Sequence, residues 1–166
     1  MKNIDLIVMG KTGSGKSTLI NAVLEEDLAP TGTGQAVTKK NEVFSKKMML
    51  PIRDVNDGQY GMIGCQINMY DTVGLEIDKA ITDQTLEEIK KHIEETKLKM
   101  ANDDIHLVWF CINNRSSRFE SYEMDLIRKL SIDHEIPFAI VLTQCFSDEE
   151  GELEEQIRKN LPEVPR

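Results

Sequence analysis

A short glycine-rich run near the N-terminus ends in a lysine and a serine. Residues 10–17, GKTGSGKS, match the pattern G-x-x-x-x-G-K-[ST] at every fixed position. Glycines let successive main-chain N–H groups turn inward around an anion; a lysine such as Lys16 reaches β- and γ-phosphates, and a hydroxyl such as that of Ser17 ligates Mg²⁺. The spacing therefore predicts a site for the phosphate tail of a nucleoside triphosphate. The side chains at the variable positions are expected to face solvent, with Thr12 also able to approach a γ-phosphate: Lys11, Thr12 and Ser14.

An acid and a glycine after a later apolar run could complete this phosphate chemistry. Asp71 and Gly74 form a D-x-x-G motif directly after the run 62–70. An acid at the carboxyl end of a strand can hold a Mg²⁺-bound water beside the phosphate loop, and a glycine can bring its N–H close to the γ-phosphate. Thr38 lies before the second expected strand, and its hydroxyl could join the Mg²⁺ shell. Two other threonines are alternatives: Thr31 and Thr33.

These residues need strands and helices to hold them, and the hydrophobic pattern predicts both. Short apolar runs indicate strands at residues 4–9, 41–50, 62–70, 105–112 and 138–143. Helical spacing of apolar residues indicates helices at 16–25, 84–100, 119–131 and 149–160. Strands separated by helices predict an α/β fold of three layers, with a doubly wound, mostly parallel sheet between helices. The second and third runs are expected to form an antiparallel hairpin through the turn signal Asp57-Gly58.

The composition narrows the choice of partners and compartment. With a net charge of −9, the chain is not expected to carry a broad nucleic-acid-binding face. Its apolar runs are shorter than the roughly 20 residues that a membrane span needs, and its first residues lack the apolar core of a signal peptide. The cysteines lie beside apolar runs and are expected to be buried, reduced thiols of a cytoplasmic protein: Cys65, Cys111 and Cys145.

Together the motifs resemble those of translation-factor-related GTPases, in particular the septin-like and Era-like branches. The resemblance rests on residues 10–24, GKTGSGKSTLINAVL, on the D-x-x-G motif, and on residues 104–110, DIHLVWF. It implies that residues 1–166 form a G domain that binds GTP or GDP with Mg²⁺. It also implies catalytic roles for Lys16, Thr38 and Gly74, and metal ligation by Ser17, Thr38 and Asp71. The implied nucleotide contacts form a larger set: Gly10, Thr12, Gly13, Ser14, Gly15, Lys16, Ser17, Thr18, Asp71, Gly74, Thr143 and Gln144.

The chain departs from that family's pattern in three places. The guanine-reading motif [NT]-K-x-D appears as residues 143–146, TQCF, so Phe146 replaces the aspartate that binds guanine, and Asp148 is a substitute only if the loop is reshaped. Leu75 stands where many relatives have a glutamine that orients water, so hydrolysis is expected to be slow or partner-assisted, with Glu76 the nearest polar candidate. Residues 161–166 look like the approach to a sixth strand. We therefore expect a C-terminally truncated domain that lacks the last strand, the alternative being a domain of five strands.

Three functions stay open at this point. The first is a slow GTP hydrolase that works as a switch, with loops that the triphosphate orders and hydrolysis releases. The second is a septin-like assembly module in which nucleotide binding matters more than turnover, with a homodimer across the nucleotide face. Arg115 and Arg118 would then be arginine fingers for the partner, or else simple surface charges. The third is a P-loop ATPase or nucleoside kinase, which the altered guanine motif keeps open.

Overall fold

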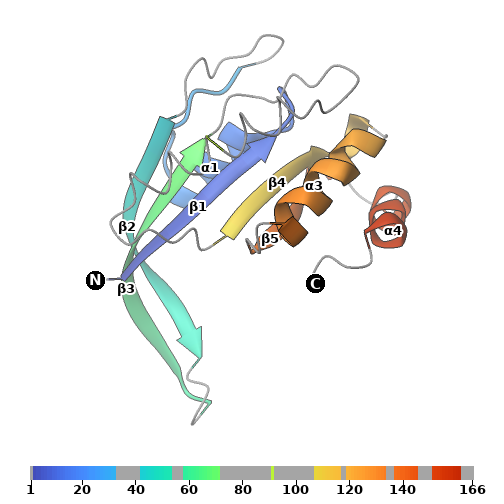
Figure 1. Ribbon diagram of the computed structural model, residues 1–166. Helices are drawn as coiled ribbons and strands as arrows, with labels where there is room; N and C mark the ends of the chain where they lie inside the picture. The colour runs from blue at the N-terminus through green and yellow to red at the C-terminus, as the bar shows by residue number, and fades with distance from the viewer. Residues whose placement is uncertain are drawn as a thin grey trace.

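A central sheet with helices on both faces forms the body of the molecule (Figure 1). This computed structural model describes residues 2–32, 42–53, 58–71, 91, 107–116, 119–133, 137–145 and 151–161. Its strands are β1 (Lys2–Gly10), β2 (Glu42–Arg53), β3 (Tyr60–Asp71), β4 (Leu107–Asn113) and β5 (Phe138–Thr143). They lie in the order β2-β3-β1-β4-β5, with β2 antiparallel to β3 and the other pairs parallel. The predicted α/β class, the mostly parallel sheet and the β2–β3 hairpin are confirmed.

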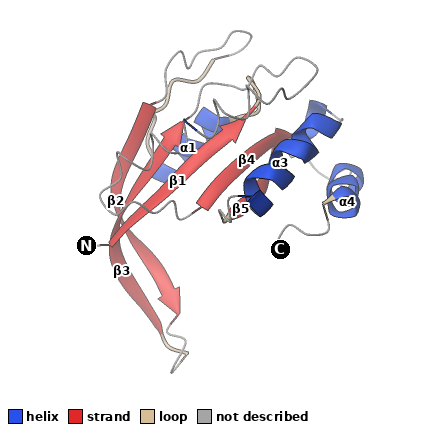
Figure 2. Cartoon of the chain, in the orientation of Figure 1, coloured by secondary structure: helices blue, strands red, loops and turns tan. Residues whose placement is uncertain are grey.

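Three helices longer than one turn are described, and they divide between the two faces of the sheet: α1 (Lys16–Leu24), α3 (Ser121–Asp133) and α4 (Gly151–Asn160). Figure 2 shows α1 behind the sheet and α3 in front of it. A short 3-10 turn, η1 (Asn114–Ser116), follows β4. The expected helix at 84–100 lies outside the described residues apart from Lys91.

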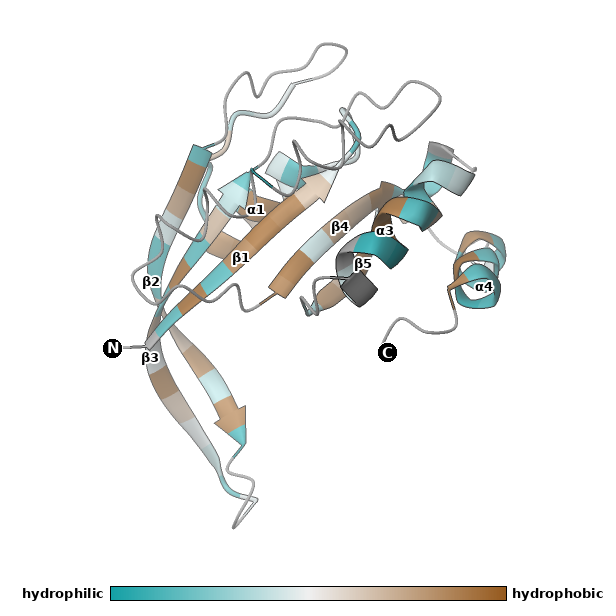
Figure 3. Cartoon of the chain, viewed as in Figure 1, coloured by the Kyte–Doolittle hydropathy of each residue, from teal (hydrophilic) through white to brown (hydrophobic). Residues whose placement is uncertain are grey.

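Side chains that alternate along β1 build a separate core on each face of the sheet. Ile7 and Met9 join the core beneath α3 and α4, where Leu126 and Ile127 are fully buried. The intervening positions, Leu6 and Val8, join the core beneath α1. The hydropathy colouring of Figure 3 shows the apolar bands that result along β1 and β4. A strand that is apolar on both faces is what a parallel sheet covered by helices requires.

The register of the strands brings their carboxyl ends to one edge of the sheet. Val8 pairs with Asp71 of β3, and Gly10 pairs with Cys111 of β4. Asn113 at the end of β4 pairs with Thr143 at the end of β5. Four parallel strands therefore finish around the turn that leads from β1 into α1, which is where an open α/β sheet places its ligand site.

The β2–β3 hairpin is longer than the sequence pattern predicted. Because β1 begins at Lys2, opposite Cys65, residues 60–64 of β3 extend beyond it, and the pair projects from the body as a two-stranded ribbon (Figure 1). Apolar side chains are exposed there, among them Met49, Tyr60 and Met62. Pro51 lies in β2, which is an edge strand of the described sheet, and an edge strand tolerates proline.

Candidate functional site

The glycine-rich run forms the turn between β1 and α1, in the strand–loop–helix setting that its pattern requires. Gly10 has a φ of +143°, and a Cβ added there would lie 2.4 Å from the carbonyl oxygen of Cys111 on the neighbouring strand. Gly15, at the N-cap of α1, has a φ of +83°. Side chains at these two positions would clash or strain the backbone, so the chain needs glycine to make this turn.

The N-terminus of α1 is open toward the turn. Gly15 has no side chain to cap the helix, and the first turn of α1 contains no acidic residue. The first N–H groups of a helix have no intrahelical acceptor, and the helix dipole adds partial positive charge at this end. An oxyanion of a phosphate group is a natural acceptor for them.

Lys16 places a buried ammonium group inside this turn. The residue is only 7% exposed, and Nζ donates to Gly10 O and Lys11 O, each at 3.1 Å. Burial lowers the pKa of Lys16, although the negative charge of Asp71 opposes that shift. A partly desolvated cation that donates to neutral carbonyl oxygens gains when an anion replaces them. Lys16 is thus suited to transfer its hydrogen bonds from the loop to a phosphate.

Two of the predicted metal ligands meet at the first turn of α1. Ser17 Oγ donates to Asp71 Oδ2 at 3.2 Å, and Asp71 is fully buried at the end of β3. A hydroxyl and a carboxylate are the hard oxygen ligands that Mg²⁺ prefers, so the donor set fits that ion. Among the described residues, no three His, Cys, Asp or Glu side chains gather into a metal site of their own. This pair would therefore hold Mg²⁺ together with phosphate oxygens and water.

Side chains from the ends of β4 and β5 hold the opposite side of the turn. Thr143 Oγ1 donates to Ser14 O at 2.6 Å, and Gln144 Nε2 donates to Gly13 O at 3.4 Å. Asn113 Nδ2 lies 3.5 Å from the same Gly13 oxygen. Thr143 and Gln144, predicted as nucleotide contacts, thus contact the phosphate loop itself, and Gln144 does so from a left-handed conformation with φ +55°.

The hydrogen bond from Thr143 also fixes the direction of the next main-chain N–H group in the loop. In a trans peptide the C=O and the following N–H point in opposite directions. Because the Ser14 carbonyl accepts from Thr143, the N–H of Gly15 in the same peptide unit is directed away from Thr143. Asn113 was not among the residues singled out in the sequence. The sequence feature that could have pointed to Asn113 is its place as a polar residue directly after the apolar run of β4, at the carboxyl end of a parallel strand.

Three expectations about exposure were wrong. Ser14 is buried at 3% exposure because its side chain lies beneath the turn, and a Cβ on Gly10 would come within 2.7 Å of Ser14 Oγ. Lys11 is only partly exposed because its side chain turns toward α3. Cys145 is exposed because it follows the last residue of β5, whereas Cys65 and Cys111 are buried as expected. Thr12 faces solvent as expected.

Several residues with expected roles lie outside the described part of the chain, and their roles remain predictions: Thr33, Thr38, Gly74, Leu75, Glu76, Arg118, Phe146 and Asp148. Thr31 is described and exposed. Arg115 is also described and exposed, in η1.

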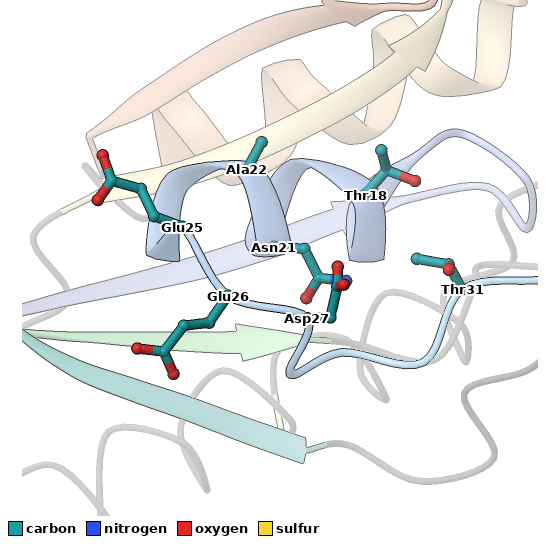
Figure 4. Close-up of a pocket in the computed structure, with 7 residues that line it drawn as sticks. All are labelled: Thr18, Asn21, Ala22, Glu25, Glu26, Asp27 and Thr31. Carbon is teal, nitrogen blue, oxygen red and sulfur yellow. The ribbon is translucent and has the colours of Figure 1, made fainter.

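A hollow of about 410 Å³ lies along the outer side of α1 (Figure 4). Thr18 and Thr31 line one end of it, and the remaining lining consists of Asn21, Ala22 and three acidic residues, Glu25, Glu26 and Asp27. Three carboxylates would repel a phosphate tail at close range. The glycine-rich turn therefore fits a phosphate tail better than this hollow does, and the hollow is a separate feature beside it.

The fold and this turn define a nucleotide-binding domain of the P-loop GTPase class, a G domain. The chain matches the family described as 50S ribosome-binding GTPase over residues 5–144, and it belongs to that family. A comparison with curated protein sequences gave no match. No helix within the described residues combines the length and the apolar character needed to cross a membrane.

Solved structures of three relatives share the fold. The septin GTPase domain from Chlamydomonas reinhardtii is 21% identical with a TM-score of 0.58, covering 99% of this chain and 62% of its own. Era from Aquifex aeolicus, bound to GDP and AlF₄⁻, is 16% identical with a TM-score of 0.63, covering 100% and 50%. Toc33 from Arabidopsis thaliana, in complex with Mg²⁺ and GMPPNP, is 21% identical with a TM-score of 0.61, covering 99% and 60%. The chain thus spans between half and two thirds of the length of these proteins.

Proposed function

We propose that this chain binds GTP and GDP with Mg²⁺ and hydrolyses GTP slowly, or with the help of a partner, as a nucleotide-dependent switch. The observation that carries the proposal is the buried Lys16 ammonium, held by Gly10 O and Lys11 O beside the uncapped N-terminus of α1. Main-chain N–H groups, a helix N-terminus and a lysine converge there, and each of them favours phosphate. Membership of a GTPase family supports guanosine triphosphate as the ligand.

Each side chain has a distinct part in this proposal. Lys16 exchanges its two carbonyl acceptors for β- and γ-phosphate oxygens. Ser17 and Asp71 would hold Mg²⁺, which would supply charge neutralisation at the phosphates. Thr38 and Gly74, which lie outside the described residues, are the residues we propose for contacts to Mg²⁺ and the γ-phosphate. Because Leu75 cannot orient the attacking water, turnover depends on a group supplied from elsewhere.

The base site is where this chain differs from its family. Gln144 stands where the family carries a lysine, and its side chain donates to the Gly13 carbonyl of the phosphate loop. The altered motif therefore still contacts the loop. The aspartate that reads guanine is replaced by Phe146. We therefore propose that phosphate recognition supplies most of the affinity and that base selectivity is modest.

A second candidate is a nucleotide-gated assembly module that forms a homodimer across the nucleotide face. Leu75 favours this function because it removes a group needed for turnover while leaving binding intact. In the chloroplast translocon components Toc33 and Toc159, dimerisation is important for GTPase activity. Sedimentation with GDP, with a non-hydrolysable GTP analogue and without nucleotide tests this candidate, because a monomer under all three conditions contradicts it. We propose a reducing, cytoplasmic setting for either function, in keeping with the buried thiols of Cys65 and Cys111.

Calorimetric titration with GTP, GDP and ATP, each with and without Mg²⁺, tests the proposal. We expect both guanine nucleotides to bind, Mg²⁺ to tighten GTP binding, and ATP to bind about tenfold more weakly, a difference of about 1.4 kcal/mol. Equal binding of ATP and GTP would contradict the guanine preference but not the phosphate site. A chain that binds none of the three would contradict the function itself.

A further inference from the structure

The side chain of Lys11 connects the phosphate loop to the start of α3. Lys11 Nζ lies 3.3 Å from Glu123 Oε2 and 3.9 Å from Glu120 Oε1. It also lies 4.8 Å from the centre of the Tyr122 ring, within the range of a cation–π contact. The Lys11 side chain, at a position that the glycine-rich pattern leaves variable, is therefore held by three contacts at the start of one helix.

Glu123 is the buried member of this group. It is only 3% exposed, and its Oε2 also accepts a hydrogen bond from the main-chain N–H of Glu120 at 3.0 Å. This contact is the half of a capping box in which the side chain three residues into the helix accepts from the N–H of the capping residue, and the main-chain bond from the Glu123 N–H to Glu120 O closes the same turn. The same carboxylate oxygen thus fixes the helix end and the Lys11 side chain.

The main chain of Lys11 organises the phosphate site. Its carbonyl oxygen accepts from Lys16 Nζ at 3.1 Å and from the N–H of Ser14 at 3.1 Å. The first hydrogen bond holds the phosphate-binding ammonium, and the second closes the turn that shapes the loop. Anchoring the Lys11 side chain therefore helps to fix the orientation of the Lys11 carbonyl, and both hydrogen bonds depend on that orientation.

We propose that Glu123 is a positioning residue for nucleotide binding, which acts by anchoring Lys11 and thereby the Lys11 carbonyl that orders the phosphate loop. This inference rests on the proposed function of the loop. The anchor differs from an ordinary surface ion pair because the carboxylate is buried and its position is fixed by the helix cap. Lys11 itself does not touch the phosphate in this account, since its ammonium is directed toward α3.

Substitution of Glu123 tests the anchor while sparing the cap. Glu123→Gln keeps an oxygen that can accept from the Glu120 N–H but loses the charge that holds Lys11. We expect it to weaken GDP binding about three- to tenfold by calorimetry, which lies in the lower part of the range for coupling between groups in contact. The matched control is Glu120→Gln, since that carboxylate is more distant and half exposed, and we expect its affinity to stay within about twofold of wild type.

Combining substitutions separates positioning from direct contact. Lys11→Gln should weaken GDP binding as much as Glu123→Gln does, and the double variant should bind GDP no more weakly than either single variant. Lys11→Arg keeps the positive charge and should bind GDP like the wild type. If Lys11 instead contacted the phosphate, Glu123→Gln would release it and tighten binding, and the double variant would be weaker than Glu123→Gln alone. Either result would overturn the proposal.

Thermal unfolding of each variant separates the anchor from a merely structural role. Wild-type affinity in Glu123→Gln, with or without a lower Tm, would show that Glu123 supports the helix but not the site. If Glu123→Gln fails to fold, the Lys11 variants still decide the question, because wild-type affinity in Lys11→Gln contradicts the anchor. Failure of the wild-type chain to bind GDP would instead contradict the proposed function, so the two failures are distinguishable.

Discussion

Thr143 and Ser14 are 129 positions apart in the sequence, yet Thr143 Oγ1 donates to Ser14 O at 2.6 Å. The contact joins the end of β5 to the phosphate loop, and Thr143 also lies against Gly15, where an added Cβ would be 3.3 Å from its Cβ. The carboxyl end of the sheet therefore shapes the loop directly. The residue that the family's guanine motif would assign to the base site is, in this chain, a support of the phosphate site.

Replacing Thr143 with valine should show how much this hydrogen bond stabilises the domain. Thr143→Val keeps the branched shape but leaves Ser14 O without its donor, so we expect the free energy of unfolding to fall by about 1–2 kcal/mol. Urea denaturation measures that loss, and GDP titration should show weaker binding as well. Thr143→Ser keeps the hydroxyl and is the control. A valine variant as stable and as tight-binding as wild type would show that the hydrogen bond is dispensable.

Removal of the Lys16 ammonium should abolish binding without unfolding the domain. Charge-assisted hydrogen bonds contribute about 1.5–3 kcal/mol each, so Lys16→Ala should weaken GTP binding at least about 100-fold. Because the partners of Lys16 are loop carbonyls outside the two hydrophobic cores, circular dichroism and Tm should change little. Lys159→Ala, at an exposed position on α4, is the control. Intact binding in Lys16→Ala would place the nucleotide somewhere else.

The Ser17 hydroxyl should matter only when magnesium is present. Ser17→Ala removes one of the two proposed ligands and leaves Asp71 in place. We expect Mg²⁺ to tighten GTP binding to the wild-type chain but to have little effect on the variant. The same titrations in a chelating buffer provide the control, because the two proteins should then bind GTP similarly. A magnesium effect of wild-type size in the variant would argue against Ser17 as a ligand.

Alkaline pH should destabilise the domain through Cys111. Burial raises the pKa of this thiol to about 12 from the ordinary 9.0. Because the folded-state pKa is the higher one, the stabilisation is complete below about pH 9 and is lost as the pH rises from there toward 12. The slope contributed by this group is at most about 1.4 kcal/mol per pH unit. Other groups also titrate in this range, so the measurement is the difference in unfolding free energy between wild type and Cys111→Ser, and a constant difference from pH 8 to 11 would contradict the assignment.

Much of this architecture was predictable from local pattern. The apolar run 105–112 predicted a central strand and corresponds to β4, which pairs with β1 and β5. The glycine-rich run predicted a strand–loop–helix turn because only glycine accommodates positions such as Gly10, where the neighbouring strand approaches closely. Such features depend on residues close in sequence or on periodic burial, and one sequence is enough to show them.

What could not be predicted depends on side chains that meet across the fold. The glycine-rich pattern allows any residue at positions 11 and 14. The position of α3 decides that Lys11 is anchored, and the register of β1 and β4 decides that Ser14 is buried. Asn113 at the end of β4 lies 3.5 Å from Gly13 O, and its polar position after an apolar run marks it as a candidate without identifying a partner 100 residues away. Contacts between distant residues of this kind require the tertiary structure.

A crystal structure of the chain grown with Mg²⁺ and a non-hydrolysable GTP analogue would show whether the glycine-rich turn binds the phosphates. We expect Lys16 Nζ to leave Gly10 O and Lys11 O for phosphate oxygens, and Mg²⁺ to lie beside Ser17 and Asp71. Thr143 should remain on Ser14 O. Density for the nucleotide elsewhere on the surface, with Lys16 still on the two loop carbonyls, would contradict the claim that this turn is the phosphate site.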